Sequence, residues 1–144
     1  MKVFQETILP DCRESFVARR FEEIRFSSPF HQHPEIELTY IVQSSGTRIV
    51  GDHIGHFTVG DLCLIGANLP HVFRNHKNLK GKAISEVLHF PRDLASGFID
   101  EAPELGAFAH LLDQAAQGVC FGPTTARRVG PRMSALREAG GTRR

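Results

Sequence analysis

The chain has 144 residues and a mass of 16.0 kDa, which gives room for one domain with its own hydrophobic core. It is 41% hydrophobic and 23% charged, an ordinary globular composition, and no stretch has the length of a membrane span or the apolar core of a secretory signal. Three widely spaced cysteines (Cys12, Cys63 and Cys120) argue against a disulfide scaffold and a zinc finger, so we expect a cytoplasmic protein without a membrane partner.

The net charge of +1 is unevenly distributed along the chain. Residues 1–122 hold 11 Lys and Arg against 15 Asp and Glu, whereas residues 123–144 hold six Arg against a single acidic residue. The larger, mildly acidic part is unsuited to holding nucleic acid by itself. The basic tail is either a contact for DNA or an acidic partner or, more simply, an exposed helix or linker with solvated arginines.

Residues 15–90 contain short candidate strands separated by turn signals, a pattern typical of a β-sandwich or a small barrel. Gly, Asn, Asp, Ser and Pro residues provide the turns at 44–46, 51–52, 60–61 and 66–70. A further hairpin tip is expected at Ile54-Gly55. We predict strands at 15–22, 36–43, 47–50, 56–58, 62–65, 71–74 and 82–90.

After Pro91 the apolar period changes from two to about 3.6 residues, which predicts helices. The first spans 104–117, with Pro103 in its first turn and Gly118 at its end. The second begins at Thr124, a good N-cap, and Gly130-Pro131 predicts a kink or a break within it. The apolar stripes consist of Leu105, Phe108, Leu111, Leu112, Ala115 and Ala116, and of Ala126, Val129, Met133 and Leu136.

The two apolar stripes bear on the oligomeric state. Packing within one subunit accounts for one stripe beside a barrel that already has its own core. The second leaves apolar surface to bury, which favours a homodimer formed through these helices.

Three histidines and a glutamate form the candidate site of the barrel. His31, His33 and Glu37 occupy positions i, i+2 and i+6, which share one face of an extended chain, and His71 opens a strand after a Gly/Asn/Pro turn. Imidazoles with one carboxylate are a familiar ligand set for Zn²⁺, Ni²⁺, Mn²⁺ or Fe²⁺. A buried Glu37 costs several kcal/mol unless it is paired or bound to a cation, so both a metal site and a metal-free histidine–carboxylate cluster remain open.

The alternation of the strands also predicts a ligand pocket. On the two motif strands, the positions that point inward with the glutamate and the last histidine are Thr39, Ile41, Phe73 and Asn75. Leu38, Tyr40 and Val42 then face a neighbouring layer. An apolar cavity with a few polar groups is the usual make-up of a small-molecule pocket. The remaining histidines, expected to be ordinary surface or core histidines, are His53, His56, His76, His89 and His110.

Two segments resemble the cupin motifs. HQHPEIE, from His31 to Glu37, matches the first motif, HxHx(3–4)E. Residues 60–75 match the second, Gx(5)PxGxxHxxxN, with Gly66 where the motif has Pro and Asn68 where it has Gly. Arg25 replaces the leading glycine of the first motif. The resemblance implies a mainly β fold, a cupin-type double-stranded β-helix barrel over residues 15–90 followed by two C-terminal helices.

The finer pattern resembles the N-terminal cupin of AraC-type transcription regulators, over roughly residues 15–140. The strings that carry it are HPEIELTYI, GDHIGHFTVGDLCLIGANLPHV and LLDQAAQGVCF. This resemblance implies that the motif residues line a pocket for a small-molecule effector, often a sugar. It also implies that residues 1–14 form an arm over the effector, although a frayed terminus or an edge strand explains them equally well. The segment 91–144 would then dimerise, and DNA would bind only through a separate helix-turn-helix domain that this chain lacks.

The sequence thus favours a sensing and dimerisation domain that is not an enzyme. The alternative is a metal-dependent cupin enzyme, such as a dioxygenase or a sugar isomerase, because three histidines and a carboxylate hold Fe²⁺ or Mn²⁺ with positions left for substrate. The two motif strands supply no protonatable catalytic partner, since Tyr40 points to the other face. A metal-binding structural barrel without an effector is the third hypothesis.

Overall fold

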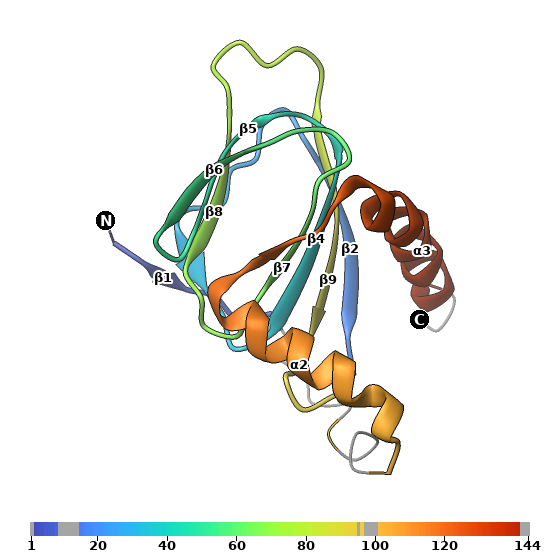
Figure 1. Cartoon of the computed structure of the whole chain (residues 1–144). Helices are drawn as coiled ribbons and strands as arrows, with labels where there is room; N and C mark the ends of the chain where they lie inside the picture. The colour runs from blue at the N-terminus through green and yellow to red at the C-terminus, as the bar shows by residue number, and fades with distance from the viewer. Residues whose placement is uncertain (1, 9–14, 95, 97–100, 142–144) are drawn as a thin grey trace.

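The computed structural model describes residues 2–8, 15–94, 96 and 101–141. Residues 9–14 of the proposed arm, which include Cys12, therefore lie outside the described part, as do residues 142–144. Two five-stranded sheets face each other (Figure 1). Sheet A has the order β1-β3-β8-β5-β6, with bounds Phe4–Gln5, His31–Gln32, His71–Asn75, Gly46–Val50 and His53–Phe57. Sheet B has the order β10-β7-β4-β9-β2, with bounds Val119–Cys120, Leu62–Ile65, Ile36–Gln43, Ala83–Phe90 and Val17–Glu23.

Each predicted strand has a counterpart in the structure, and the differences come from short or turn-bounded elements. The predicted strand 56–58 is in fact β6, which begins at His53, because the β5–β6 hairpin turns at Gly51 with a φ of 61°. The predicted hairpin tip at Ile54-Gly55 is therefore wrong. The two-residue strands β1, β3 and β10 were not predicted, because so short a segment has no measurable alternation.

The first helical region covers one end of sheet B. It consists of a 3₁₀ turn at Pro103–Leu105, helix α2 at Gly106–Gln114 and a second 3₁₀ turn at Ala115–Gln117. Leu112 and Ala115 are buried against the apolar outer face of the sheet. The residues that they pack with are Ile36, Leu64 and Phe90.

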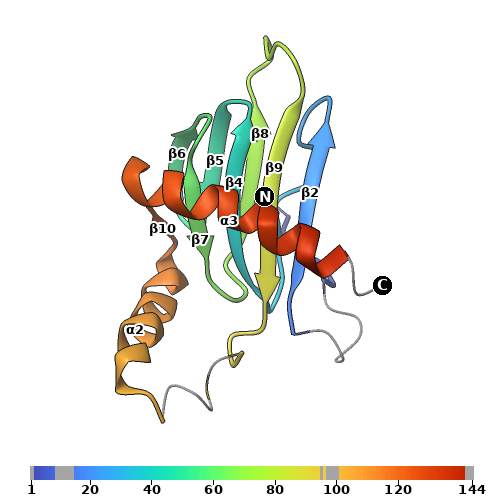
Figure 2. The same cartoon turned by 90° about the vertical axis from the view of Figure 1, so that its right-hand side faces the viewer.

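Helix α3, Pro123–Gly141, crosses the outer face of sheet B over β2 and β9 (Figure 2). Ala126 and Met133 are buried there together with Leu62, and Tyr40 lies at the edge of the same cluster. The kink or break predicted at Gly130-Pro131 does not divide the helix, which runs as one element. Pro131 is on its exposed side, where water is available to the carbonyl that loses its hydrogen bond.

Both apolar stripes thus pack on the barrel of the same chain. The second stripe leaves only Leu136 substantially exposed, at 37%. The surplus of apolar surface from which we inferred a dimer is therefore largely covered within one subunit. Among the helices of the described residues, none combines the length and apolar character required to cross a membrane.

A buried ion pair fastens the last turns of α3 to the sheet. The side chain of Glu86 in β9 is only 1% exposed. Arg137 donates from Nε to its Oε2 at 2.9 Å, Ser134 donates to Oε1 at 3.1 Å, and Arg20 of β2 donates to Oε1 at 3.3 Å. The hydrogen bond to this carboxylate raises the pKa of Arg137, so the guanidinium keeps its charge at all ordinary pH values.

Candidate metal centre and cavity

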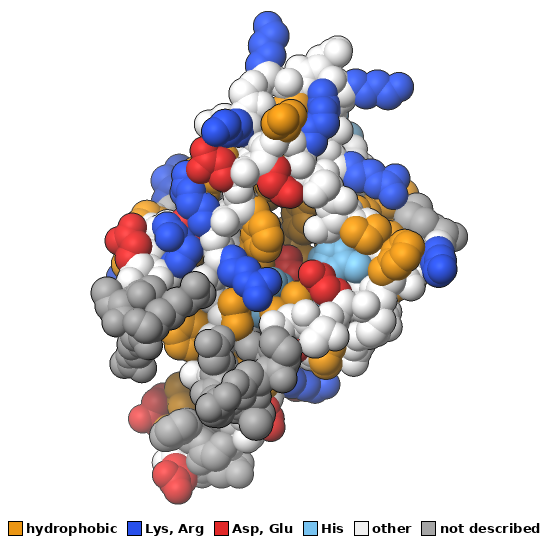
Figure 3. All heavy atoms as spheres, turned by 180° about the vertical axis from the view of Figure 1, so that it is seen from behind, with side chains coloured by type: hydrophobic (Ala, Val, Ile, Leu, Met, Phe, Trp, Pro, Cys, Tyr) orange, Lys and Arg blue, Asp and Glu red, His pale blue; other side chains and the backbone are white. Residues whose placement is uncertain are grey.

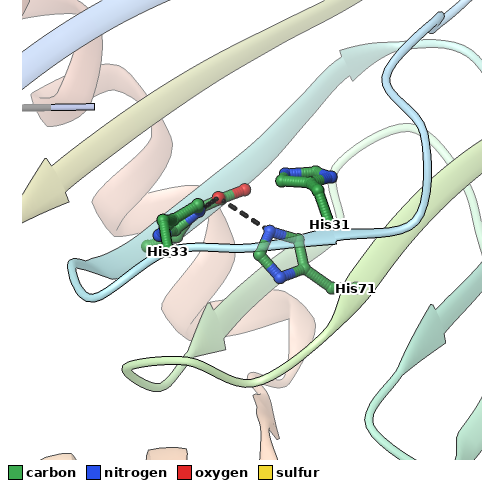
Figure 4. A group of neighbouring side chains, drawn as sticks. His31, His33 and His71 are labelled. Atoms are coloured by element: carbon green, nitrogen blue, oxygen red, sulfur yellow. Dashed lines mark hydrogen bonds and ion pairs between the residues drawn. The ribbon is translucent and has the colours of Figure 1, made fainter. Parts of the chain in front are cut away.

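The four motif residues meet between the two sheets, as predicted. His31 lies on β3, His33 in the following turn, Glu37 on β4 and His71 on β8. One candidate ligand atom from each lies within 4.8 Å of all the others. Figure 4 shows the three histidine rings turned toward one another from these neighbouring segments.

The reason for this convergence differs from the predicted one. Residues 31–37 do not form one extended strand, because the chain leaves sheet A after Gln32 and enters sheet B at Ile36. His31 instead faces His71 directly across the β3–β8 pair, with ring centroids 4.3 Å apart. The turn between the sheets then carries His33 over the carboxylate of Glu37.

The carboxylate of Glu37 is the centre of the site. Three histidine Nε2 atoms surround Glu37 Oε2: that of His33 lies 2.9 Å away, that of His71 3.0 Å and that of His89 3.1 Å. Thr39, one strand repeat further along β4, donates its hydroxyl to Oε1 at 2.6 Å. Both carboxylate oxygens of Glu37 thus have hydrogen-bonding partners.

His89 was not predicted to belong to the site, and this interpretation is corrected here. It lies on β9 directly opposite Glu37 in the β4–β9 pair, and its side chain is 5% exposed. His89 points into the barrel on the same face of the strand as Ser85 and Val87. The alternation along residues 82–90 could therefore have indicated that its side chain faces the interior. The pairing register that brings it to Glu37 was not visible in the sequence.

The other ring nitrogens are held by backbone carbonyls. Nδ1 of His31 lies 2.7 Å from Pro29 O, that of His33 lies 3.0 Å from Glu35 O, and that of His71 lies 2.7 Å from Leu69 O. Because a carbonyl oxygen only accepts, these three Nδ1 atoms carry the hydrogen, and a neutral ring is left with a bare Nε2. In His33 and His71 that atom faces Glu37 Oε2, which is also an acceptor, so a positive charge must lie between them: a second proton or a metal ion.

The pKa shifts have the same origin. Burial by itself would raise the pKa of Glu37, but the charge of His71 and the hydrogen bonds from His33, His71 and His89 hold it well below its usual value. Burial lowers the pKa of His71, yet the adjacent Glu37 carboxylate outweighs burial and raises it. The pKa of His31 is lowered, first by burial and then by the charge of His71. The cluster therefore keeps Glu37 ionised and attracts positive charge.

These residues fit a divalent transition metal. Three imidazoles and one carboxylate suit Zn²⁺, Ni²⁺, Mn²⁺ or Fe²⁺, and the ligands would be His31, His33, Glu37 and His71. His33 Nε2 and His71 Nε2 lie 2.9 and 3.0 Å from Glu37 Oε2, and all four candidate ligand atoms lie within 4.8 Å of one another, close enough to share one ion. The carbonyls behind the rings, and His89 and Thr39 behind the carboxylate, are the outer partners that orient such ligands.

A cavity of about 130 Å³ adjoins the cluster and opens on the face shown in Figure 3. Of the predicted pocket residues, Thr39, Ile41 and Phe73 line it. Asn75 does not, which corrects that prediction. Its Oδ1 accepts from Phe26 N at 2.7 Å and its amide donates to Ser45 O at 3.2 Å, so it fastens loops at the end of β8 instead. Further lining residues come from other strands: Arg19, Phe21, Ser85 and Val87.

The N-terminal segment contributes to the cavity wall. Strand β1 pairs in parallel with β3, so the segment is an edge strand of sheet A. Beyond it, Glu6 Oε2 lies 3.3 Å from His31 Nε2, and Ile8 is 2% exposed and lines the cavity. The described part of the predicted arm therefore lies against the site, while residues 9–14 are outside the described part.

The turn before His71 explains both departures from the second cupin motif. Asn68 takes the place of a glycine and has a φ of 56°, a left-handed conformation that asparagine tolerates better than most residues. A Cβ on Gly66 would lie 2.5 Å from Ala115 O, because the turn packs directly on the end of the first helical region. Its N–H donates to that same oxygen at 2.8 Å, and Asn68 N donates to His33 O at 2.7 Å.

No protein-family model matches the chain, and no curated protein matches it either. Among solved structures it is similar to apo ToxT K231A of Vibrio cholerae, with 12% identity over 85% of this chain and 48% of that one, at a TM-score of 0.54. It is also similar to a cupin 2 conserved barrel domain protein of Rhodopseudomonas palustris, with 21% identity, coverage of 58% and 57%, and a TM-score of 0.47. A third is oxalate decarboxylase of Bacillus subtilis, with 21% identity, coverage of 55% and 22%, and a TM-score of 0.44.

At these identities the likeness concerns the fold alone, and the chain spans less than two thirds of each of these proteins. The two facing sheets, the convergence of the motif residues between them and the two helices on the outside confirm the predicted class. The protein is a mainly β, cupin-type barrel followed by two C-terminal helices.

Proposed function

We propose that this chain is the small-molecule-sensing and dimerisation domain of an AraC-family transcription regulator, and that its effector binds in the cavity between the sheets. The observation that carries the proposal is the make-up of that cavity. His31, Glu37 and His71 provide one polar wall, and Ile8 from the N-terminal segment adds to the lining. The other lining residues are a mixture of apolar and polar side chains: Phe21, Phe26, Ile41, Phe73 and Val87, and Glu6, Arg19, Glu23, Ser28, Thr39, Ser85 and His89. A barrel filled by side chains would have favoured a purely structural role instead.

Two likenesses support a regulator over other cupin proteins. The sequence resembles AraC-type cupins over roughly residues 15–140, and the fold is similar over 85% of the chain to ToxT, an AraC-family regulator. DNA binding would then belong to a separate domain. We expect the isolated chain to have no appreciable affinity for DNA.

The effector we expect is compact, with a polar end at the histidine cluster and an apolar body. Arg19 and Ser85 add polar contacts, while Phe21 and Phe73 offer flat apolar faces, a combination that also suits a sugar ring. When bound by the motif residues, a divalent ion would supply a Lewis-acidic centre for an oxygen of the effector. The chain's own residues orient the effector and exclude water.

Because Ile8 and Glu6 are part of the wall, effector binding and the position of the N-terminal segment are coupled. The size of that coupling is limited by the difference in effector affinity between the two arrangements of the segment. Dimerisation through the segment 91–144 is part of the proposal and depends on the resemblance, since the apolar stripes are largely covered by their own barrel. Sedimentation equilibrium of the purified chain tests it.

The test of effector binding starts from elemental analysis of chain purified without chelator and native mass spectrometry for a co-purified molecule. A compound that raises Tm in a screen of sugars and small carboxylic acids is then measured against Ile41→Trp, which fills the cavity and leaves the histidines in place. Ile54→Trp, on the exposed surface of β6, is the matched control. The proposal predicts that only Ile41→Trp abolishes the shift; equal shifts in both variants would refute binding in the cavity.

The second candidate remains a metal-dependent enzyme. The fit of the cluster to Fe²⁺ or Mn²⁺ favours it, and the structure brings Glu6 and Glu23 to the cavity, so protonatable groups absent from the motif strands are present in the wall. Oxygen consumption or isomerisation of a screened compound by the Fe²⁺- or Mn²⁺-loaded chain would establish this candidate instead of the sensor.

A further inference from the structure

Cys63 and Cys120 face each other across the β7–β10 pair, and neither lines the proposed effector cavity. They are direct antiparallel partners, and their Sγ atoms are 3.9 Å apart as free thiols. Phe121 N donates to Leu62 O at 3.0 Å, which makes the adjacent cysteine pair a non-hydrogen-bonded one. At such positions the Cα atoms are about 4.5 Å apart, within the range that a disulfide spans.

The two thiols have different environments. Cys63 is 2% exposed, whereas Cys120 is exposed at the edge of an open groove beside the C-terminal end of α2. Arg48 of β5 donates from Nη2 to Cys120 Sγ at 2.9 Å, and the same guanidinium is held by Asp61 at 3.3 Å. A surface sulfur thus has a cation beside it and a buried thiol behind it, the arrangement of a reactive cysteine with a resolving partner.

The acidities follow this arrangement. The hydrogen bond between Cys120 and Cys63, followed by the charge of Arg48, lowers the pKa of Cys120 to about 6 against the opposing effect of burial. The pKa of Cys63 is raised, by its interaction with Cys120 and by burial. At neutral pH the exposed sulfur is therefore the thiolate, and the buried one keeps its proton.

We propose that Cys120 and Cys63 form a reversible oxidation site, at which a hydroperoxide oxidises Cys120 and Cys63 then closes a disulfide. The Cys120 thiolate attacks one peroxide oxygen, the O–O bond breaks, and the departing oxygen takes a proton and leaves as water or alcohol. The Cys63 thiol then loses its proton and attacks the sulfenic sulfur, the S–O bond breaks, and water leaves. The two sulfurs lose two electrons, and the peroxide gains them.

The disulfide would act on the connection between the two helical regions. Strand β10 is two residues long and joins the end of the α2 region to α3. A covalent link to β7 fixes that connection to the barrel. Cys63 is also the cross-strand neighbour of Thr39, whose hydroxyl holds Glu37, so the oxidised pair lies beside the candidate metal centre. This proposal does not depend on the proposed function.

The first test uses the full chain carrying Cys12→Ser, so that two thiols remain, with the unaltered chain in parallel. After treatment with hydrogen peroxide, peptide mapping without reductant is expected to find Cys63 linked to Cys120, with the loss of two hydrogen atoms and full reversal by dithiothreitol. Sulfinic or sulfonic acid at Cys120 with a free Cys63 thiol would overturn the proposal, and so would disulfides between chains only.

The second test measures the activation of Cys120. In Arg48→Gln we expect iodoacetamide to modify Cys120 about tenfold more slowly at pH 7, with Arg48→Lys retaining most of the rate. Arg132→Gln, on the exposed side of α3, is the control. Should Arg48→Gln fail to fold, the pH profile of the unaltered chain decides. Half-maximal reactivity near pH 6 supports the proposal, and the ordinary value of about 8.5 overturns it.

Discussion

The protonation of individual rings determines the character of the histidine cluster. His31, His33 and His71 each donate from Nδ1 to a backbone carbonyl, which leaves Nε2 to a proton or a metal. His89 differs, because its Nδ1 is buried without a hydrogen-bond partner in the described part of the chain. Its hydrogen is therefore on Nε2, directed at Glu37, and His89 positions the carboxylate without needing an additional charge.

From this we expect His89→Leu to weaken metal binding about 10- to 100-fold, the usual effect of losing an outer partner of a ligand. Isothermal titration with Zn²⁺ or Mn²⁺ measures it. His89→Gln, which keeps an N–H donor, should recover part of the metal affinity. His110→Leu, at an exposed position of α2, should leave the metal affinity unchanged. An unchanged affinity in His89→Leu would show that Glu37 is positioned without this histidine.

The pKa shifts predict how the stability of the metal-free protein depends on pH. The lowered pKa of Glu37 gives a stabilisation that is present above its ordinary value of 4.5 and lost as pH falls through the folded value. The raised pKa of His71 gives one that is complete below 6.5 and lost as pH rises through the folded value. Above pH 6.5 the chelator-treated protein should therefore lose stability, by at most about 1.4 kcal/mol per pH unit for one proton.

Added metal should reverse this slope, because neutral histidines bind the ion better as pH rises. Urea unfolding between pH 5 and pH 8, about the range over which histidine titrates, with and without Zn²⁺, measures both slopes. Glu37→Gln should remove both dependences. The same slope in the presence and absence of metal would contradict a metal site at this cluster.

At the scale of elements, Gly130 lies within helix α3, where glycine has a low helix propensity, at the point where the helix packs on sheet B. A Cβ on Gly130 would lie 2.6 Å from the Tyr40 ring, so the glycine allows the helix to approach sheet B. We expect Gly130→Ala to destabilise the protein, although alanine usually stabilises a helix by about 1 kcal/mol. Gly140→Ala meets no atom within 4 Å and is the control, expected to be neutral or stabilising. Thermal unfolding compares them; a higher Tm for Gly130→Ala would mean that α3 does not pack closely on Tyr40.

The same helix is fastened by the Glu86 ion pair. Arg137→Ala leaves the buried Glu86 carboxylate with only Arg20 and Ser134 as donors among the described contacts. The cost of burying its charge is then less well compensated. We expect a loss of about 1–3 kcal/mol in the free energy of unfolding. Arg128→Ala, at an exposed position of α3, should change it by less than about 0.5 kcal/mol. Equal effects of the two substitutions would assign the stability of α3 to its apolar contacts alone.

For the molecule as a whole, the N-terminal segment forms part of the cavity wall, and we expect it to restrict access to the site. Deleting residues 1–8 removes Ile8 from the wall and the Glu6 contact from His31. We expect bound Zn²⁺ to pass to a chelator several-fold faster in the shortened chain, while the barrel keeps its fold, because β1 is an edge strand. Stopped-flow transfer to a coloured chelator measures the rate, and circular dichroism checks the fold. An unchanged rate would show that the segment does not restrict access.

Much of the fold and of the candidate site could be predicted from local patterns. Alternation, turn residues and the change of period after Pro91 located the main strands and both helices, because each depends on neighbours within a few residues. The motif spacing brought out His31, His33, Glu37 and His71, although residues 31–37 are not one extended segment that presents a single face.

Other features were decided only by the tertiary structure, because they depend on which distant strands pair and in which register. The β4–β9 register brings His89 to Glu37, and the β7–β10 register brings Cys120 to Cys63. Asn75 has the predicted inward parity but is drawn into loop hydrogen bonds. The sequence by itself therefore located the main strands and the four candidate ligands, because alternation and motif spacing are visible within short segments. Only the tertiary structure determined their partners, since pairing between remote segments has no local signature.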